Sequence, residues 1–445
     1  MTDPDRTAAD VAAGPDLANL SLGSSVAGVA DEAGDPAPDR AAGSRGGPGR
    51  DFRFLLSAAL ASTLGDGALL AALPLLARTL TDDPKLVAGV TTASTLPWLL
   101  LSLVGGALAD RMDRRQLMII AQSVQAALVG TVAVLASLDM VDIWVLYLLA
   151  FGLSSAEILF TNSSQALVPT IVGTRHLERA NGRLVAAQSV SKEFVGPPLG
   201  AALFAFVVPL PFWLNTATFL VSVLLISRIR SVRRAPRPSG GPTLLRDVGI
   251  GLRWLRRHRL PLTLTVVAGA GNFCEAMALS TLVLFAHDVL HIGDRGYGLL
   301  LAAMAAGGIL GSLVAGRAVA RIGGLRVAIV VQVIGPVVLL CIGLFGRDPV
   351  TVVLLFTVFS VALAMWNVVS YSTRQRVVPG ELLGRVSGAG RMASYGGLPL
   401  GALVGGFLAN SYGLVAPWLV GAALNAVVVA FAVPSLIRHW ESGPA

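Results

Sequence analysis

The chain has 445 residues, of which 54% are hydrophobic and 13% are charged, and its mean hydropathy is +0.72. A typical soluble protein has about a quarter of its residues charged, so these values indicate a membrane protein. A spanning helix needs about 20 apolar residues, and the length accommodates twelve of them with loops and tails. The two cysteines, Cys274 and Cys341, lie inside apolar stretches, which excludes a disulfide-stabilised secreted scaffold.

The chain carries 34 lysines and arginines against 26 aspartates and glutamates. The positive residues lie between apolar stretches and not on one soluble basic segment, so we expect no nucleic-acid partner. The two lysines, Lys85 and Lys192, do not follow the glycine that a Walker A phosphate loop requires. We therefore expect neither ATP-driven activity nor a cofactor.

We predict an all-α membrane protein with twelve transmembrane helices in two six-helix pseudo-symmetric halves, because lipid cannot hydrogen-bond to an open strand or an irregular loop. The predicted parts are a disordered tail (1–50), an N-terminal bundle (51–228), a basic linker (229–261), a C-terminal bundle (262–437) and a short C-terminus (438–445). The predicted spans cover residues 54–77, 86–108, 116–138, 143–166, 184–208, 211–228, 262–286, 297–316, 327–346, 350–373, 388–410 and 414–436.

The distribution of basic residues predicts the orientation. The loops after the even-numbered spans and the C-terminus carry 24 lysines and arginines, whereas the opposite loops carry four. The positive-inside rule therefore places both termini in the cytoplasm of a multi-pass cell-membrane protein. In the linker, Leu245, Val248, Leu252 and Leu255 recur at helical spacing. They predict an amphipathic helix that lies on the inner leaflet or, equally well, one that only connects the halves.

An internal repeat supports the two predicted halves. Asp66 and Glu275 are 209 residues apart and have similar neighbours. Residues 106–111 match 316–321 at an offset of 210, and residues 198–201 match 399–402 at an offset of 201. The difference between the offsets places a nine-residue shortening before the eleventh span. Parallel repeats of this kind are typical of transporters that bind substrate in a mid-membrane cavity between the halves.

The segment 106–115 resembles the signature loop of the major facilitator superfamily, although Asp113 stands where a glycine is usual. The segment 196–201 is similar to the Gly-Pro kink motif of that family's drug and proton antiporters. Residues 52–437 as a whole resemble the bacterial branch that contains the enterobactin exporter and macrolide efflux proteins, on segments that include 156–157, 177–183 and 298–300. The resemblance implies efflux of a small molecule in exchange for protons.

Five ionisable residues fall well inside predicted spans, away from the span ends: Asp66, Glu157, Lys192, Glu193 and Glu275. Each costs at least about 2.5–3.5 kcal/mol at a helix centre, so each requires an explanation. Asp66 and Glu275 reach mid-membrane, where they are candidates for binding a proton or a cationic substrate group; a hydrogen-bonded acid that only ties helices together is the alternative. Glu157 and Lys192 lie at equal depth in their spans, so they can form an ion pair that leaves Glu193 free to face the cavity. The alternative is that this ion pair serves only packing specificity.

The signature loop supplies a candidate gate, formed by Gly106, Asp110, Arg111, Arg114 and Arg115. Ion pairs from this loop to the other half would form in one state and break in the other. Topology offers a simpler explanation, because arginines here fix the orientation whatever the mechanism.

Glycines and prolines supply candidate helix kinks or close contacts at Gly196, Pro197, Gly200, Pro399 and Gly401. Trp366 and Asn367 lie deep enough to line a cavity. His287 and His291 have the spacing of paired metal ligands but no complete ligand set, so we predict no metal site.

We predict a proton-coupled exporter of a small amphipathic or hydrophobic compound, such as a drug, an antibiotic or a secondary metabolite. The expected partners are this substrate, protons and the lipid bilayer, and we expect a monomer. An importer of a small nutrient or siderophore is the alternative within transport. A membrane-embedded enzyme or sensor is a weaker alternative, because no nucleophile-base pair or phosphate loop occurs within the spans.

Overall fold

The computed structural model describes residues 49–172, 177–229 and 244–440, which belong to one compact unit that spans 47–445. The predicted tail up to residue 48, the linker from 230 to 243 and the last five residues lie outside the described residues. No strand occurs in the described ranges. The helices are α1 (Arg50–Leu80), α2 (Pro84–Arg111), α3 (Arg114–Ser137), α4 (Ile143–Val172), α5 (Leu177–Gln188), η2 (Ser189–Val195), α6 (Gly196–Phe206), α7 (Leu210–Ser227), α8 (Leu244–Arg257), α9 (Arg259–Leu279), α10 (Leu282–Leu284), η3 (Phe285–Val289), α11 (Asp294–Ile322), α12 (Gly324–Phe345), α13 (Pro349–Val377), α14 (Gly380–Tyr395), α15 (Gly397–Tyr412) and α16 (Ala416–Trp440).

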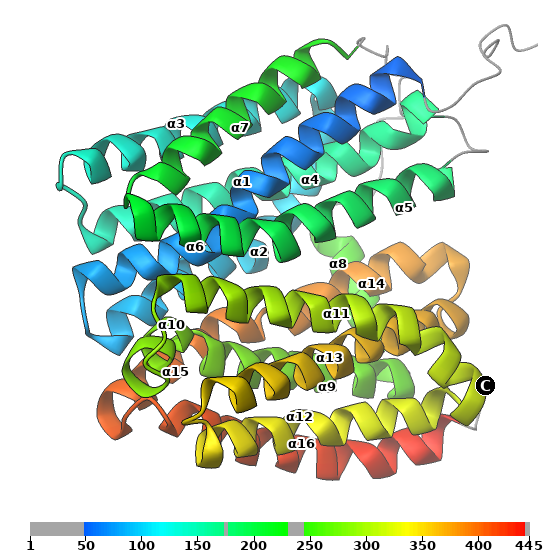
Figure 1. The fold of residues 1–445 in the computed structure, drawn as a ribbon. Coiled ribbons are helices and arrows are strands. Elements are labelled where there is room, and N and C mark those ends of the chain that lie inside the picture. The colour runs from blue at the N-terminus through cyan, green and yellow to red at the C-terminus, as the bar shows by residue number, and fades with distance from the viewer. Residues whose placement is uncertain (1–48, 173–176, 230–243, 441–445) are drawn as a thin grey trace, which may run out of the picture. The chain divides into compact units, whose positions relative to one another are not determined.

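Among the described residues, ten helical segments are long and apolar enough to cross a membrane. The helices α1, α3, α4 and α7 pack on one another, and α9, α11, α12, α13 and α16 do the same (Figure 1). In the first group α2 packs on α4 and α6 on α1, and in the second α15 packs on α9. The main contacts between the two groups join α2 to α15 and α6 to α11.

Three predicted single spans are interrupted in the structure. The span predicted at 184–208 contains the π-helix η2, the one at 262–286 breaks at Ser280 and Thr281, and the one at 388–410 breaks at Gly396. Hydropathy averages over a window of residues, so it does not detect a break of one or two residues inside an apolar stretch.

At one end of the helices a single apolar cluster includes residues of both groups, and at the other end each group has its own cluster. The second half of α1, from Leu69 to Ala77, belongs to a cluster that also contains Phe285, Leu300 and Trp418. The first half of α1 packs instead in a cluster confined to residues 52–229, and a third cluster contains only residues from 264 onward. The large apolar cluster that joins the two groups of helices therefore lies at one end of α1.

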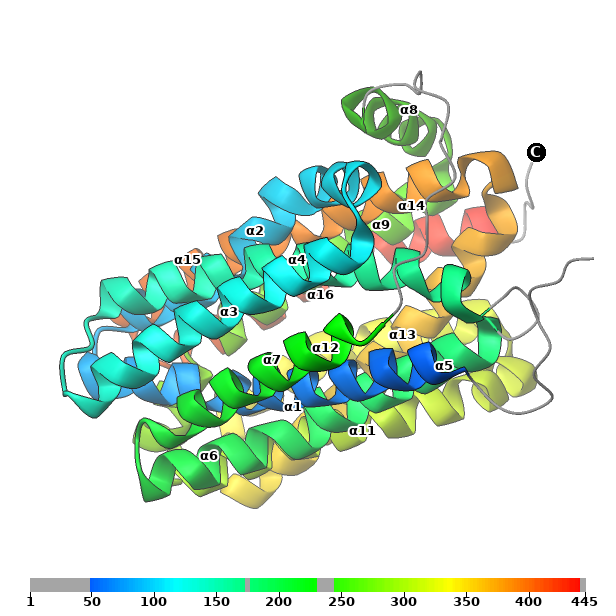
Figure 2. The ribbon, with the colours of Figure 1, turned by 90° about the horizontal axis from the view of Figure 1, so that it is seen from above.

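Helix α8 packs on α14 (Figure 2). Leu255 is buried in a small cluster with Val378, Val386 and Ala389. A Cβ on Gly251 would lie 2.4 Å from the backbone oxygen of Arg385, which shows how closely the two helices approach. Part of the apolar face predicted to contact lipid therefore faces protein, in agreement with the alternative of a connecting helix.

Candidate functional site: two polar cavities between the helices

A first cavity of about 240 Å³ contains Asp66, and we call it the Asp66 cavity. Four of the five ionisable residues predicted inside spans line it. Its lining comes from α1, α2, α3, α4, α5 and η2 and consists of Ser62, Thr63, Asp66, Trp98, Gln122, Gln125, Glu157, Phe160, Thr161, Val185, Gln188, Ser189, Lys192 and Glu193.

The structure brings Lys192 and Glu157 into an ion pair, in which the Lys192 ammonium donates to the Glu157 carboxylate. Their side chains are 27% and 29% exposed, so the pair is largely removed from solvent. Asp66 interacts electrostatically with both of them, and Glu193 interacts with Lys192. One ammonium therefore interacts electrostatically with three carboxyl groups, so the protonation of one carboxyl group affects the interactions of the other two.

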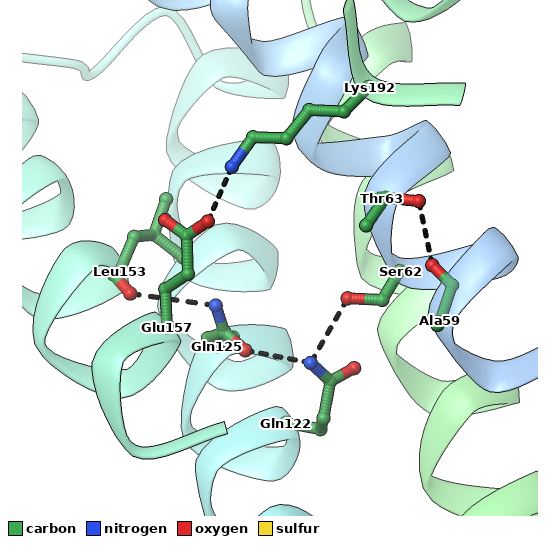
Figure 3. A network of polar contacts seen from close by, with 8 residues as sticks. All are labelled: Ala59, Ser62, Thr63, Gln122, Gln125, Leu153, Glu157 and Lys192. Carbon is green, nitrogen blue, oxygen red and sulfur yellow. Dashed lines mark hydrogen bonds and ion pairs between the residues drawn. The ribbon is translucent and has the colours of Figure 1, made fainter. Parts of the chain in front are cut away.

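Next to this pair lies a network of neutral polar groups (Figure 3). The Gln122 amide donates to the Ser62 hydroxyl at 3.1 Å and to the Gln125 amide oxygen at 3.0 Å. Gln125 donates to the Leu153 carbonyl at 3.5 Å. The Oε1 atom of Gln122 is buried and has no hydrogen-bond partner among the described residues. It is therefore an acceptor available to a proton-bearing group or to water. The sequence analysis missed both glutamines, although two amides three residues apart in an apolar span are the signal for such a network.

The π-helix η2 presents Lys192 and Glu193 to this cavity. Pro197 and Pro198 follow it and have no backbone N–H, so Glu193 and Phe194 cannot receive the usual helical hydrogen bonds. A widened turn with bonds five residues apart accommodates this loss. The widened turn packs on α1, where a Cβ on Gly67 would lie 2.4 Å from the Lys192 carbonyl oxygen.

The predicted kink residues lie at close helix contacts. A Cβ on Gly200 would lie 2.1 Å from the Ala68 oxygen of α1, and one on Gly401 would lie 2.2 Å from the Phe273 oxygen of α9. Gly196 likewise meets Gly67 of α1, while Pro197 and Pro399 are buried. Close packing of small residues therefore accounts for these glycines.

A second cavity of about 190 Å³ contains Glu275, and we call it the Glu275 cavity. No ion pair to Glu275 occurs among the described residues. The predicted cavity residues Trp366 and Asn367 both line it. The full lining is Val267, Ala268, Gly271, Asn272, Glu275, Val331, Gln332, Gly335, Phe359, Ala362, Leu363, Trp366, Asn367, Ser370, Tyr371, Arg374, Ser387, Arg391, Ser394, Tyr395 and Asn425.

Asp66 and Glu275 therefore line two cavities and not the single one predicted. Trp98 of the Asp66 cavity meets Tyr395 of the Glu275 cavity edge to face, with 6.5 Å between ring centroids and 78° between ring planes. The two aromatic rings, from α2 and α14, lie where the cavities adjoin.

The predicted gate is only partly visible. The side chains of Gly106, Asp110 and Arg111 lie outside the described residues. Arg115 donates to the Ile226 and Ser227 carbonyls at the end of α7, so it contacts its own group of helices.

Asp113 begins α3 by accepting a hydrogen bond from the Gln116 N–H at 2.9 Å. This helix cap gives a structural reason for an aspartate where the superfamily signature has a glycine.

Of the two histidines, His287 has protein contacts in the structure. His287 contacts Asp294 at 3.0 Å and the Val283 carbonyl at 3.1 Å. No group of three or more metal-ligating side chains occurs in the part of the chain that the structure describes.

Comparisons with known proteins complete the description of the site. A family described as transmembrane secretion effectors, within the major facilitator superfamily, matches residues 49–444. The multidrug efflux pump Tap of Mycobacterium tuberculosis is 27% identical over 419 residues, which cover 88% of this chain and 95% of Tap. The enterobactin exporter EntS of Escherichia coli O9:H4 is 25% identical over 407 residues, which cover 88% of this chain and 94% of EntS.

A shorter match covers 54% of both chains, at 29% identity, with YfiS of Bacillus subtilis, an uncharacterised transporter of the superfamily. A solved structure of a mutant form of the nucleoside transporter NupG has the same fold, with a TM-score of 0.73 at 14% identity, over 86% of this chain and 99% of NupG. Because the family match extends over nearly the whole described region, the chain belongs to the transmembrane secretion effectors, an efflux branch of the major facilitator superfamily, and is a multi-pass membrane transporter and not an enzyme.

Proposed function

We propose that the chain is a twelve-span secondary transporter that exports a small amphipathic or hydrophobic compound by alternating access, in exchange for protons. Ten spans meet the length and hydropathy criteria, with α14 and α15 counted as one. The proposed remaining two are α2 and the continuous run α5–η2–α6, which the π-helix divides. The distribution of arginines supports cytoplasmic termini and a location in the cell membrane.

The division of the core supports an inward-open state. If α1 starts at the cytoplasmic side, its second half and the shared apolar cluster lie at the outer side. There Arg78, near the end of α1, contacts Asp288 of η3 at 3.7 Å. In this proposed state, the separation of the inner clusters would leave the two cavities open toward the cytoplasm. Breaking the outer contacts and forming inner ones would expose the cavities to the outside, as alternating access requires.

The observation that carries proton exchange is the position of the two acids. Asp66 and Glu275 occupy matching positions of the repeat, and each lines a cavity between spanning helices. An acid in such a place is functional by default, because its charge is costly unless it serves binding or transfer. Asp66 interacts electrostatically with the Lys192 ammonium, so movement of that ammonium would change the balance between the charged and the protonated acid.

Export as the direction is supported by the relatives, because Tap is named an efflux pump and EntS an exporter. The test is transport by purified protein in liposomes, with a panel of amphipathic compounds and an imposed pH gradient. Asp66→Asn should abolish accumulation driven by the gradient while exchange of labelled for unlabelled compound at equal concentrations persists. Glu275→Gln should lower the driven transport less.

The matched control is Asp139→Asn, because Asp139 is exposed between α3 and α4 and its backbone has a φ of 54°, which asparagine also adopts. This variant should transport like the unmodified protein. Full gradient-driven transport by Asp66→Asn would refute the proposed coupling. Uptake into intact cells, in place of lowered accumulation, would contradict the direction.

A further inference from the structure

The Glu275 cavity contains two arginines that the proposed proton exchange does not use. Arg374 lies in the last turn of α13 and Arg391 lies on α14, and both line the cavity. Arg374 interacts electrostatically with Tyr371, which also lines the cavity, and with Arg391. The one acidic side chain in the lining is Glu275, for which no electrostatic interaction with either arginine is found. This part of the cavity therefore has two positive charges without a counter-charge among the described residues.

Arg374 is the more unusual of the two. Its Nε and Nη2 atoms are buried and have no hydrogen-bond partner within the described part of the chain. A buried donor without a partner destabilises the folded protein, and more so when the donor is charged. Native proteins keep such groups where a ligand supplies the missing acceptor, or where function requires them.

Topology and helix capping do not explain this burial. An arginine in the last turn of a helix complements the partial negative charge there and marks the cytoplasmic side. Arg376, two residues further on, can both complement the helix end and mark the cytoplasmic side. Its side chain is exposed, and its Nε donates to the Ser372 carbonyl at 3.4 Å. The unpaired Arg374 guanidinium requires a separate reason.

The rest of the lining defines what would fit. Trp366 is only 5% exposed and supplies an aromatic face, and Phe359 and Leu363 add apolar surface. The planar guanidinium fork matches the two oxygens of a carboxylate better than an ammonium does. In the Asp66 cavity, by contrast, Lys192 is already paired with Glu157.

We propose that the Glu275 cavity is a binding site for a small organic anion, in which Arg374 holds an oxyanion group such as a carboxylate, Arg391 adds a second positive charge, and Trp366 contacts the apolar body. The inference rests on the proposed transport function and names its substrate class. The expected cargo is an amphipathic acid and not a lipophilic cation.

The test measures binding to purified protein in lipid nanodiscs without any gradient, with 2-naphthoate and its neutral analogue 2-naphthamide as probes. Equilibrium dialysis against empty nanodiscs corrects for partition into lipid. We expect the acid to bind at least about tenfold more tightly than the amide, the magnitude of one charge-assisted hydrogen bond. Arg374→Gln should abolish this preference, and Arg374→Lys should retain only part of it because it keeps the charge without the fork.

The matched control is Arg376→Gln, which removes a charge from the same turn outside the cavity and should leave the preference unchanged. Equal binding of the two probes by the unmodified protein would overturn the proposal, as would a preference that survives in Arg374→Gln. Loss of the preference in Arg376→Gln would also overturn it, because a general surface charge would then suffice. Binding needs no proton gradient, so a failure of proton coupling and a failure of the anion site give different results.

Discussion

The ion pair between Lys192 and Glu157 allows a prediction that distinguishes its two members. Lys192→Met removes the only ammonium of the Asp66 cavity and leaves Glu157 close to Asp66. Glu157→Gln removes one of the carboxyl groups around Lys192, but the ammonium keeps Asp66 as a neighbour. The two changes break the same ion pair and leave different residual charges.

The structure sets the magnitude of each loss. Removal of one member of a fully buried pair costs about 3–5 kcal/mol, whereas an exposed pair contributes about 0–1 kcal/mol. With side chains 27% and 29% exposed, the Lys192–Glu157 pair lies between these limits. We expect Lys192→Met to lower the free energy of unfolding by about 2–3 kcal/mol and Glu157→Gln by about 1 kcal/mol. The double variant should lose less than the sum of the single losses, because it leaves neither partner unpaired.

The assay is the apparent melting temperature of the purified variants in one detergent at one heating rate, because membrane proteins commonly unfold irreversibly. The order of stability should be unmodified protein, Glu157→Gln, then Lys192→Met. A larger loss in Glu157→Gln than in Lys192→Met would contradict the arrangement of three carboxyl groups around one ammonium. A double variant that loses the full sum would show that the two side chains do not interact.

Two further predictions concern packing and capping, and both are read from the same melting assay. Gly67→Ala should destabilise the protein by about 1–3 kcal/mol, because its Cβ would meet the Lys192 backbone and not a flexible side chain. The control Gly182→Ala should be neutral or stabilising, because a Cβ there would have nothing within 4 Å. Equal effects of the two substitutions would refute the close contact at Gly67. Asp113→Ala should cost about 1 kcal/mol through loss of the α3 cap, whereas Asp113→Gly should cost only a few tenths. Equal losses in these two variants would exclude capping as the role of Asp113.

The sequence predicted the helical class and the ionisable residues that lie within the helices, because twenty-residue apolar stretches and ionisable residues within them are physically demanding and therefore informative. It did not predict the π-helix, although Pro197 and Pro198 were both visible, because the response of a helix to two prolines depends on what packs against it. The position of Arg374 at a span end agreed with the positive-inside rule, so nothing in the sequence suggested that its Nε and Nη2 atoms are buried. The contact between Trp98 and Tyr395 joins residues almost 300 positions apart, which no local pattern encodes.

The repeat makes the difference between the two cavities informative. Under the same offsets that align the repeat, Glu157 corresponds to Asn367 and Lys192 to Ala393. The second cavity therefore has no counterpart of the ion pair, although Asn367 occupies the lining at the matching place. If the two halves arose by duplication, as the repeat suggests, they have kept the acid of each cavity, Asp66 or Glu275, but not the cation beside it.

The two repeats also differ in their arginines, but here the second repeat has the charged residues that the first lacks. Arg374 corresponds to Ser164 and Arg391 to Val190, so neither has a charged counterpart in the first repeat. If the arginines served only to orient the chain in the membrane, the burial of the Arg374 Nε and Nη2 atoms would add cost without benefit. An anion that occupies one cavity while protons exchange in the other would account for both differences. It would also give Glu275 a role, since a negative cargo and a carboxylate in one cavity repel each other unless the Glu275 carboxyl group is protonated.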